Sequence, residues 1–301
     1  MPPGRRTAVS RMEVRVQCSG EMPLGTYLRR YTDISAGMIK RLKAVPDGIT
    51  RDGEHLRTVD PVRSGDLITL HLPEHCDHTP NPLLHVPVVY ESAQILVCNK
   101  PAGIPAHPSM LHRTDTLANW FAAVCPESGF HLVNRLDRNT SGLCVIAKTV
   151  YAAHRLHAQV QKRYYALVPN GLTGSGTVNA PIARERESVI TRCVRADGKP
   201  AVTHYRVIRQ TPRCTLLELI PETGRTHQIR VHMAYLGYPL LGDALYGGEC
   251  SVLQTHALHC GRMLLPEPGT GKLLTLTAPL RQDMQLLLHP DIPETERNTE
   301  I

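Results

Sequence analysis

Residues 134–143 read Asn134-Arg135-Leu136-Asp137-Arg138-Asn139-Thr140-Ser141-Gly142-Leu143. This stretch is rich in hydrogen-bonding side chains and leads into the apolar residues 142–147, a pattern typical of a buried strand. Catalytic groups often lie on loops that rigid strands hold in place. Asp137 has Arg135 and Arg138 beside it, and neighbouring cations favour the ionised carboxylate that a nucleophile requires. The residues alone leave two interpretations open: a catalytic loop, or a capped turn with a solvated aspartate.

The segments on the C-terminal side of this loop indicate an α+β domain. Thr149 is a suitable N-cap for a helix containing Val150, Ala153 and Val160, and residues 226–236 suit a second helix that ends before Gly237. Strands and helices do not alternate regularly, which favours α+β over a doubly wound sheet. The predicted strands after residues 142–147 are 164–168, 202–208 and 214–220.

The N-terminal region predicts a small domain of two helices and a strand. Residues 23–44 contain two short amphipathic patterns, and Ser35 is a suitable N-cap for the second. A strand pattern begins at Gly65. Prolines and turn-forming residues between positions 73 and 89 then indicate a linker. We therefore expect an N-terminal domain (1–75), a linker (76–89), a catalytic domain (90–290) and a polar tail (291–301).

Charge and composition narrow the classes of protein. The chain has 301 residues and a formal net charge of +7, which is compatible with a polyanionic partner. No apolar run approaches the ~18 residues that span a bilayer, and the first residues lack the apolar core of a secretory signal. The nine cysteines are scattered and form no Cys-x-x-Cys pair, unlike a disulfide framework. These features predict a cytoplasmic protein that does not bind membranes.

Five motifs follow one another along the chain. They are Asn99-Lys100-Pro101-Ala102-Gly103 with His107-Pro108, Arg135-Leu-Asp137-x-x-Thr140-Ser141-Gly142, Lys162-x-Tyr164-x-Ala166-x-Val168, Thr223-Gly-Arg225-Thr-His227-Gln-Ile-Arg230-Val-His232, and Pro239, Gly242-Asp243 and Leu258-His259. Together they resemble the motifs of the RluA-type RNA pseudouridine synthases. The resemblance covers roughly residues 88–280 and implies a pseudouridine-synthase-like α+β domain on a mixed, largely antiparallel sheet. Asn134 departs from the pattern, because many members have His or Pro there.

The resemblance implies an isomerase with three catalytic residues. Asp137 would be the essential carboxylate. Tyr164 would stack on the target base and could remove the C5 proton, although a core aromatic on a strand is the alternative interpretation. Arg225 would pair with Asp137 and keep it ionised, the alternative being a surface cation beside a turn. The implied reaction needs no cofactor, and the target uridine must leave its stack by base flipping.

Structured RNA is the expected partner, ribosomal RNA being preferred over transfer RNA. The N-terminal domain resembles the S4-type RNA-binding module in part, with Pro23-Leu24-Gly25 in place of the usual Arg-Leu-Asp. The alternative is a small helical domain with solvated charges. Arg135 would contact a phosphate or fill the space of the extruded base. The residues expected to contact RNA are Arg135, Arg138, Lys100, His107, Arg29, Arg30, Lys40, Arg41, Lys43 and Arg230.

Two other functions are compatible with the sequence. One is an RNA-binding scaffold of the same fold without activity, which would have no chemical need to retain Asp137, Tyr164 and Arg225 together. The other is an enzyme of free uridine compounds, which the basic charge disfavours. We expect no metal, because no group of His and Cys shows a complete four-ligand pattern. The groups with partial patterns are His154 with His157, His256 with His259, and His75, Cys76 and His78.

Overall fold

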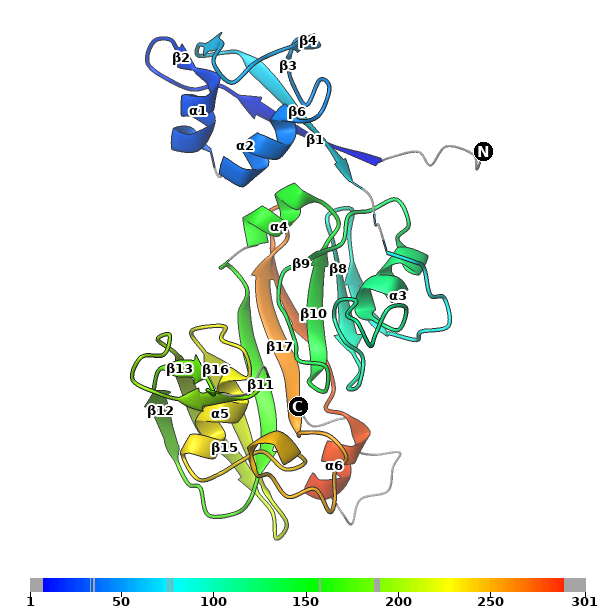
Figure 1. Ribbon diagram of the computed structural model, residues 1–301, viewed down its shortest axis with the longest axis vertical. Helices are drawn as coiled ribbons and strands as arrows, with labels where there is room; N and C mark the ends of the chain where they lie inside the picture. Colours follow the sequence, from blue (N-terminus) through cyan, green and yellow to red (C-terminus); the bar gives the residue numbers. More distant parts are fainter. Residues whose placement is uncertain are drawn as a thin grey trace.

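The structure is a computed structural model that describes residues 8–289, apart from residues 33, 35, 75, 77, 157 and 187–189. A small N-terminal domain stands at one end of a larger domain, so the molecule is elongated (Figure 1). Within the described ranges, no helix is long and apolar enough to cross a membrane.

The N-terminal domain packs two helices against an antiparallel sheet of order β1-β6-β3-β4. Leu24, Leu28 and Leu42 from the helices are buried with Ile68 of the sheet in a separate apolar cluster. The sequence patterns predict both helices and β6, but not β1, which pairs with β6 along its whole length. Ser35 lies outside the described residues. The elements are β1 (Ala8–Arg15), β2 (Met22–Pro23), α1 (Leu24–Tyr31), α2 (Ala36–Lys43), β3 (Ile49–Arg51), β4 (Glu54–His55), β5 (Pro61–Val62) and β6 (Leu67–Glu74).

The larger domain is built on a ten-stranded sheet of order β12-β15-β16-β11-β17-β10-β8-β7, with β18 paired to β17 and β9 to β10. Its strand pairs are antiparallel except β10–β17, which is parallel. The expected α+β domain with a mixed, largely antiparallel sheet is confirmed. The strands are β7 (Val88–Glu91), β8 (Ile95–Lys100), β9 (His131–Leu132), β10 (Ser141–Ala147), β11 (Gln161–Val168), β12 (Ser175–Asn179), β15 (Val202–Gln210), β16 (Thr215–Pro221), β17 (Leu258–Pro266) and β18 (Leu273–Thr277).

Helices and a small hairpin surround this sheet. As expected, Thr149 caps the helix that follows it, since its hydroxyl accepts a hydrogen bond from the Ala152 N–H at 3.0 Å. Val160 lies beyond the end of that helix, and Gly237 takes φ +83° just after α5. The elements are α3 (Leu117–Val124), α4 (Val150–Leu156), the hairpin of β13 (Ile182–Arg184) and β14 (Arg192–Val194), α5 (Gln228–Tyr235), the 3-10 turn η1 (Ala244–Tyr246) and α6 (Gln282–Leu288).

The parallel contact between β10 and β17 fixes where the 134–143 loop enters the sheet. Every residue of β10 is buried. Gly142 pairs with Cys260 at φ +109°, and a Cβ atom there would lie 2.4 Å from the Cys260 carbonyl oxygen. Only glycine meets both conditions. The residues just before Gly142 are therefore held at one end of the sheet.

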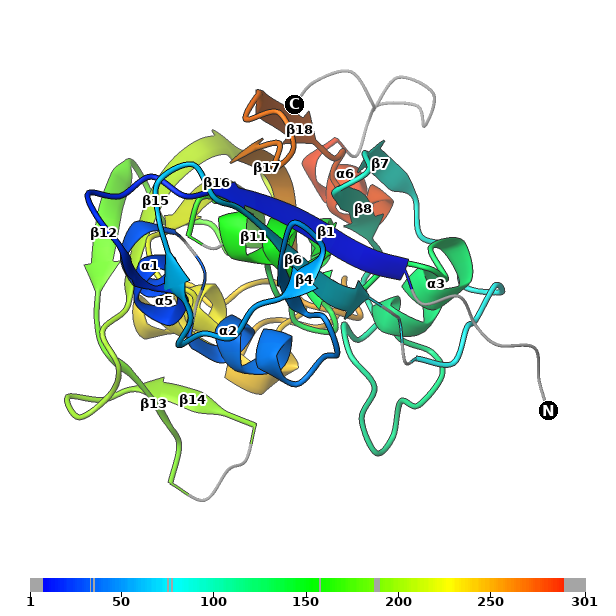
Figure 2. The same ribbon diagram turned by 90° about the horizontal axis from the view of Figure 1, so that it is seen from above.

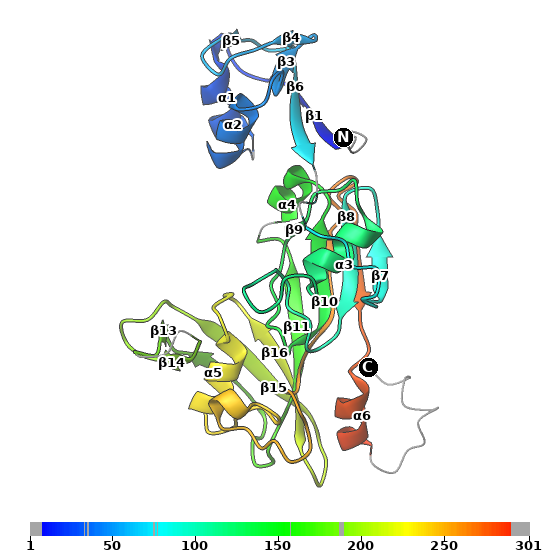
Figure 3. The same ribbon diagram turned by 45° about the vertical axis from the view of Figure 1, so that its right-hand side comes forward.

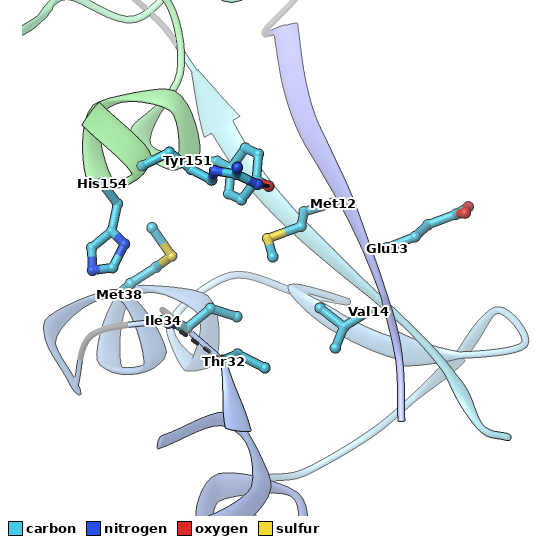
Figure 4. Close-up of a pocket in the computed structure, with 9 residues that line it drawn as sticks. Met12, Glu13, Val14, Thr32, Ile34, Met38, Tyr151 and His154 are labelled. Atoms are coloured by element: carbon cyan, nitrogen blue, oxygen red, sulfur yellow. Dashed lines mark hydrogen bonds between the residues drawn. The ribbon is translucent and has the colours of Figure 1, made fainter. Parts of the chain in front are cut away.

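The two domains meet at α4. Val150 packs against the N-terminal apolar cluster. Beside it lies a cavity of about 200 Å³, into which Met12, Met38 and Tyr151 point (Figure 4). In the predicted linker, Cys76 and Val86 belong to the core of the larger domain. The connection is thus packed against that domain at these two positions.

Candidate active site

A cavity of about 650 Å³ opens where the 134–143 loop meets β11 and α5. Its volume lies within the range of small-ligand sites. Three motifs that are far apart in the sequence supply most of its lining. The lining residues include Ala106, His107, Arg135, Asp137, Lys162, Tyr164, Thr223, Arg225, His227 and Arg230.

Asp137 lies in this cavity with its side chain 28% exposed. Its loop is closed by a hydrogen bond from the Thr140 N–H to the Asp137 carbonyl at 3.1 Å. One carboxylate oxygen, Oδ2, lies 3.3 Å from Nη1 of Arg230 and 3.9 Å from Nε2 of His227. The carboxylate is therefore open to the cavity, and Arg230 donates to it from one side.

The expected ion pair between Asp137 and Arg225 is wrong. Arg225 is exposed on the cavity wall, and its Nε donates to the Pro200 carbonyl at 3.0 Å. Within the described residues, Arg230 is the arginine paired with Asp137. The motif at residues 223–232 contains both arginines, but only Arg230 lies on α5. The sequence does not reveal which of them that helix directs at the loop.

Arg230 is a buried cation between two carboxylates. Its side chain is 8% exposed, and it donates to both oxygens of Asp243 at 2.8 Å as well as to Asp137. Burial opposes its charge, but the hydrogen bonds and charge of Asp243 raise the pKa of Arg230 above its ordinary value. Asp243 thus anchors the guanidinium that contacts Asp137. The same side chain also lines the cavity, so its contact with RNA stays a prediction.

Tyr164 lies on β11, opposite Cys260 and Leu219 in the neighbouring strands, and lines the cavity. It is 8% exposed. Burial raises the pKa of the Tyr164 phenol well above its ordinary value. The phenol is therefore protonated at neutral pH. Contact of the Tyr164 ring with the target base stays a prediction.

Lys100 does not face the cavity, so its expected contact with RNA is wrong. The side chain is fully buried, and its Nζ donates to three carbonyls, those of Pro101, Ile104 and Arg138, at 2.8 to 2.9 Å. Burial lowers the pKa of Lys100 to about 8. The ammonium therefore joins the loop after β8 to the loop that carries Asp137, because Arg138 is the next residue.

Two buried histidines hold the other end of the 134–143 loop. The Thr140 hydroxyl lies 2.8 Å from Nε2 of His256, and the Ser141 hydroxyl 2.9 Å from Nδ1 of His259. Burial lowers the pKa of His256 to about 2 and that of His259 to about 4, so both are neutral near pH 7. These two histidines, which form one of the partial metal-ligand patterns in the sequence, thus bond to the loop instead. His75 and His157 lie outside the described residues.

The remaining residues expected to contact RNA are exposed or line the cavity. Arg135 and His107 line the cavity, and the Arg138 Nε donates to the Gly103 carbonyl at 3.0 Å. In the N-terminal domain, α1 and α2 lie on the same side of the molecule as α5 and the β13–β14 hairpin (Figures 2 and 3). The exposed basic residues of these two helices are Arg29, Arg30, Lys40, Arg41 and Lys43.

The sequence interpretation missed three site residues: His227, Asp243 and Tyr246. His227 and Asp243 stand inside recognised motifs, but no contact can be assigned to them from spacing. Tyr246 lies in a segment that the sequence indicates only as a turn. Its hydroxyl lies 2.7 Å from Nδ1 of His227, and Arg230 lies over its ring at 5.0 Å.

Comparisons with known proteins agree with this geometry. Residues 94–235 match the family described as RNA pseudouridylate synthase. The chain is 38% identical over 270 residues to an uncharacterised RNA pseudouridine synthase of Bacillus subtilis, YjbO, covering 85% of this chain and 94% of that protein. It is 36% identical over 310 residues to ribosomal large subunit pseudouridine synthase D of Pseudomonas aeruginosa, covering 92% and 96%. The solved structure of human RNA pseudouridylate synthase domain containing 1 superposes with a TM-score of 0.56 at 25% identity, covering 71% of this chain and 98% of that one.

Proposed function

The chain belongs to the RluA-type family of RNA pseudouridine synthases, and we propose that it isomerises specific uridines in ribosomal RNA, with Asp137 as the catalytic carboxylate. The observation that carries this proposal is the cavity itself. Asp137, Tyr164 and Arg230 come from three separate motifs and line one space. Its volume is large enough for a nucleotide.

The reaction is an isomerisation within one nucleotide. The C1′–N1 bond of uridine breaks, the uracil turns while it is held, and C5 bonds to C1′. N1 gains a proton and C5 loses one, so no other reactant is consumed. Asp137 supplies an ionised oxygen within reach of the nucleoside, whether it attacks C1′, adds at C6 or removes the 2′ proton. Tyr164 holds the uracil through its ring face.

The target uridine must be flipped out of its stack to enter this cavity. Arg135 is exposed at the cavity wall, two residues before Asp137 in the loop. We assign it to the RNA backbone or to the space that the flipped base leaves. The basic helices α1 and α2 extend this surface along the same side of the molecule. We propose that they contact phosphates, as an S4-like module would.

Ribosomal RNA is preferred to transfer RNA because relatives of high coverage, such as that of Pseudomonas aeruginosa, are named for the ribosomal large subunit. A scaffold without activity is disfavoured because a buried ion-pair network still orients Asp137. Such a network is costly to keep where no chemistry depends on it.

The proposal is tested by mapping pseudouridine in cellular RNA with and without the gene. Loss of specific sites in ribosomal RNA, restored by the purified protein acting on that RNA, is the expected result. If pseudouridine is lost only from transfer RNA, the substrate is transfer RNA and not ribosomal RNA. If the pseudouridine map is unchanged and the purified protein forms no product from either RNA, the alternative of an RNA-binding scaffold without activity is favoured.

A further inference from the structure

His227 has a backbone conformation that side chains rarely adopt. It is the N-cap residue of α5, with φ 57° and ψ 19° in the left-handed region. Residues other than glycine in this region are uncommon and concentrate at functional sites. The conformation places the imidazole at the cavity wall between Asp137 and Tyr246.

Hydrogen bonds fix the direction of the imidazole. The backbone N–H of Arg192 donates to the Tyr246 hydroxyl oxygen at 3.0 Å, so the hydroxyl proton is available for another partner. That partner is Nδ1 of His227, at 2.7 Å. A neutral imidazole has one N–H. When Tyr246 donates to Nδ1, the proton of His227 lies on Nε2, the atom that faces Asp137.

The charges around His227 agree with this tautomer. Burial lowers the pKa of the imidazole; Asp137 and Asp243 act to raise it, and Arg230 and Arg192 act to lower it further. The net lowering keeps the ring neutral near pH 7. The opposite tautomer would point the Nε2 lone pair at a carboxylate, and charge repulsion disfavours that arrangement.

Both donors of the site approach the same oxygen of Asp137. Arg230 lies 3.3 Å and His227 3.9 Å from Oδ2. For the described residues, no hydrogen bond or ion pair involves Oδ1. The longer distance is compatible with a contact that tightens only when substrate fills the cavity.

We propose that His227 is a positioning residue, whose Nε2–H joins Arg230 on Oδ2 of Asp137 and so presents Oδ1 to the nucleoside, with Tyr246 selecting the tautomer. This inference rests on the proposed function, because it assigns the reacting oxygen of that same carboxylate.

Two substitutions at one position separate the two nitrogens. In the variant His227→Gln, the side-chain amide places an N–H donor near the position of the imidazole Nε2. Asn in His227→Asn tolerates the left-handed backbone but reaches only the Tyr246 side. We expect His227→Asn to lower kcat by about 10- to 100-fold, the effect of removing one hydrogen bond to a charged group, with KM for RNA unchanged. His227→Gln should recover most of that activity.

Tyr246→Phe tests the tautomer with His227 left in place. Without the hydroxyl, the neutral ring is free to place its proton on Nδ1, and kcat should fall. A protonated ring carries N–H on both nitrogens, so the deficit in kcat relative to the unaltered protein should narrow as the pH falls below the ordinary histidine value toward the lowered pKa of His227. A residue with only a packing role would show no such narrowing.

The outcomes are distinguishable from failure of the proposed function. If the unaltered protein forms no pseudouridine in any RNA tested, the proposed function fails. If it is active and the folded His227→Asn protein matches it in kcat, the positioning role is overturned. Equal deficits in His227→Asn and His227→Gln, or a pH-independent deficit in Tyr246→Phe, would also overturn it.

Discussion

Arg230 Nη1 lies 3.3 Å from Asp137 Oδ2, although 93 residues separate the two in the chain. The same guanidinium donates to Asp243 at 2.8 Å from two of its nitrogens. A buried cation bound in this way has a fixed position, because leaving Asp243 would strand a charge in the interior. Asp137 therefore meets a donor whose place is set before RNA binds.

Removing Arg230 should disable the enzyme. We expect Arg230→Met to lower kcat by at least about 100-fold, because Asp137 and Asp243 both lose their partner, and to cost on the order of 3–5 kcal/mol of stability. Arg230→Lys should be more stable than Arg230→Met, because lysine retains the positive charge, although it lacks the planar guanidinium that donates to both oxygens of Asp243. Single-turnover kinetics and denaturant unfolding measure the two effects.

The matched control is Arg225→Met, in the same motif and cavity. Its guanidinium is exposed and bonds to a backbone carbonyl, so kcat should stay within about tenfold while KM for RNA rises. If Arg225→Met proved as inactive as Arg230→Met, with its fold intact, the assignment of Arg230 as the essential partner would fail.

Lys100 should contribute to the stability of the fold and not to the charge interaction with RNA. Lys100→Met leaves three buried carbonyls without their donor, so we expect a decrease of roughly 3 kcal/mol in the free energy of unfolding. The exposed Lys272 provides the control, and Lys272→Met should change stability by less than about 0.5 kcal/mol. If the Lys100→Met protein had normal stability and its RNA affinity had become less dependent on salt, the prediction that Lys100 contacts RNA would be supported after all.

Buried histidines should make the fold sensitive to acid. The folded-state pKa values of His259 and His256 are about 4 and about 2. Below the ordinary value near 6.5 the unfolded chain takes up protons that the folded chain does not, so stability falls as pH falls from there toward 4.

The size of this effect is testable by substitution. In His259→Gln, the fall between about pH 6.5 and about pH 4 should be shallower by up to about 1.4 kcal/mol per pH unit. Urea unfolding at several pH values measures it. Parallel curves for the variant and the unaltered protein would show that His259 does not titrate in this window.

Basic residues on α2 should contribute to RNA binding by pairing with phosphates. Replacing Lys40, Arg41 and Lys43 together by Gln should reduce the slope of log affinity against log salt by roughly one unit for each phosphate that is no longer neutralised. Lys272→Gln, adjoining β18 on the opposite side of the molecule (Figure 2), should leave the slope unchanged. Equal slopes for the triple variant and the control would show that α2 is not part of the RNA-binding surface.

The motifs in the sequence predict the cavity, because each motif combines a turn with chemically specific side chains. Asp137, Tyr164 and Arg225 do line one space. The sequence also predicts the buried strand β10, which is an apolar run, and the helix α5, which is followed by Gly237 as a local stop signal. These features depend on residues that are close in the sequence.

The features that the sequence does not predict depend on distant residues. Arg225 and Arg230 are equally basic, and only the placement of α5 decides which one meets Asp137. An RNA contact is the natural prediction for Lys100 because lysine is usually exposed, whereas three backbone carbonyls from two loops compensate its burial. The strand β1 is missed because its stabilising partner, β6, begins more than 50 residues later.

The most direct test of the central claim is the rate at which the purified Asp137→Asn protein forms pseudouridine in its RNA. Asn keeps the shape of the side chain and leaves the Arg230–Asp243 pair in place, but it offers no ionised oxygen. We predict that product formation falls by about a thousandfold or more, with RNA affinity and the unfolding transition nearly unchanged. A folded Asp137→Asn protein that forms pseudouridine at a rate near that of the unaltered chain would contradict the assignment of Asp137 as the catalytic carboxylate.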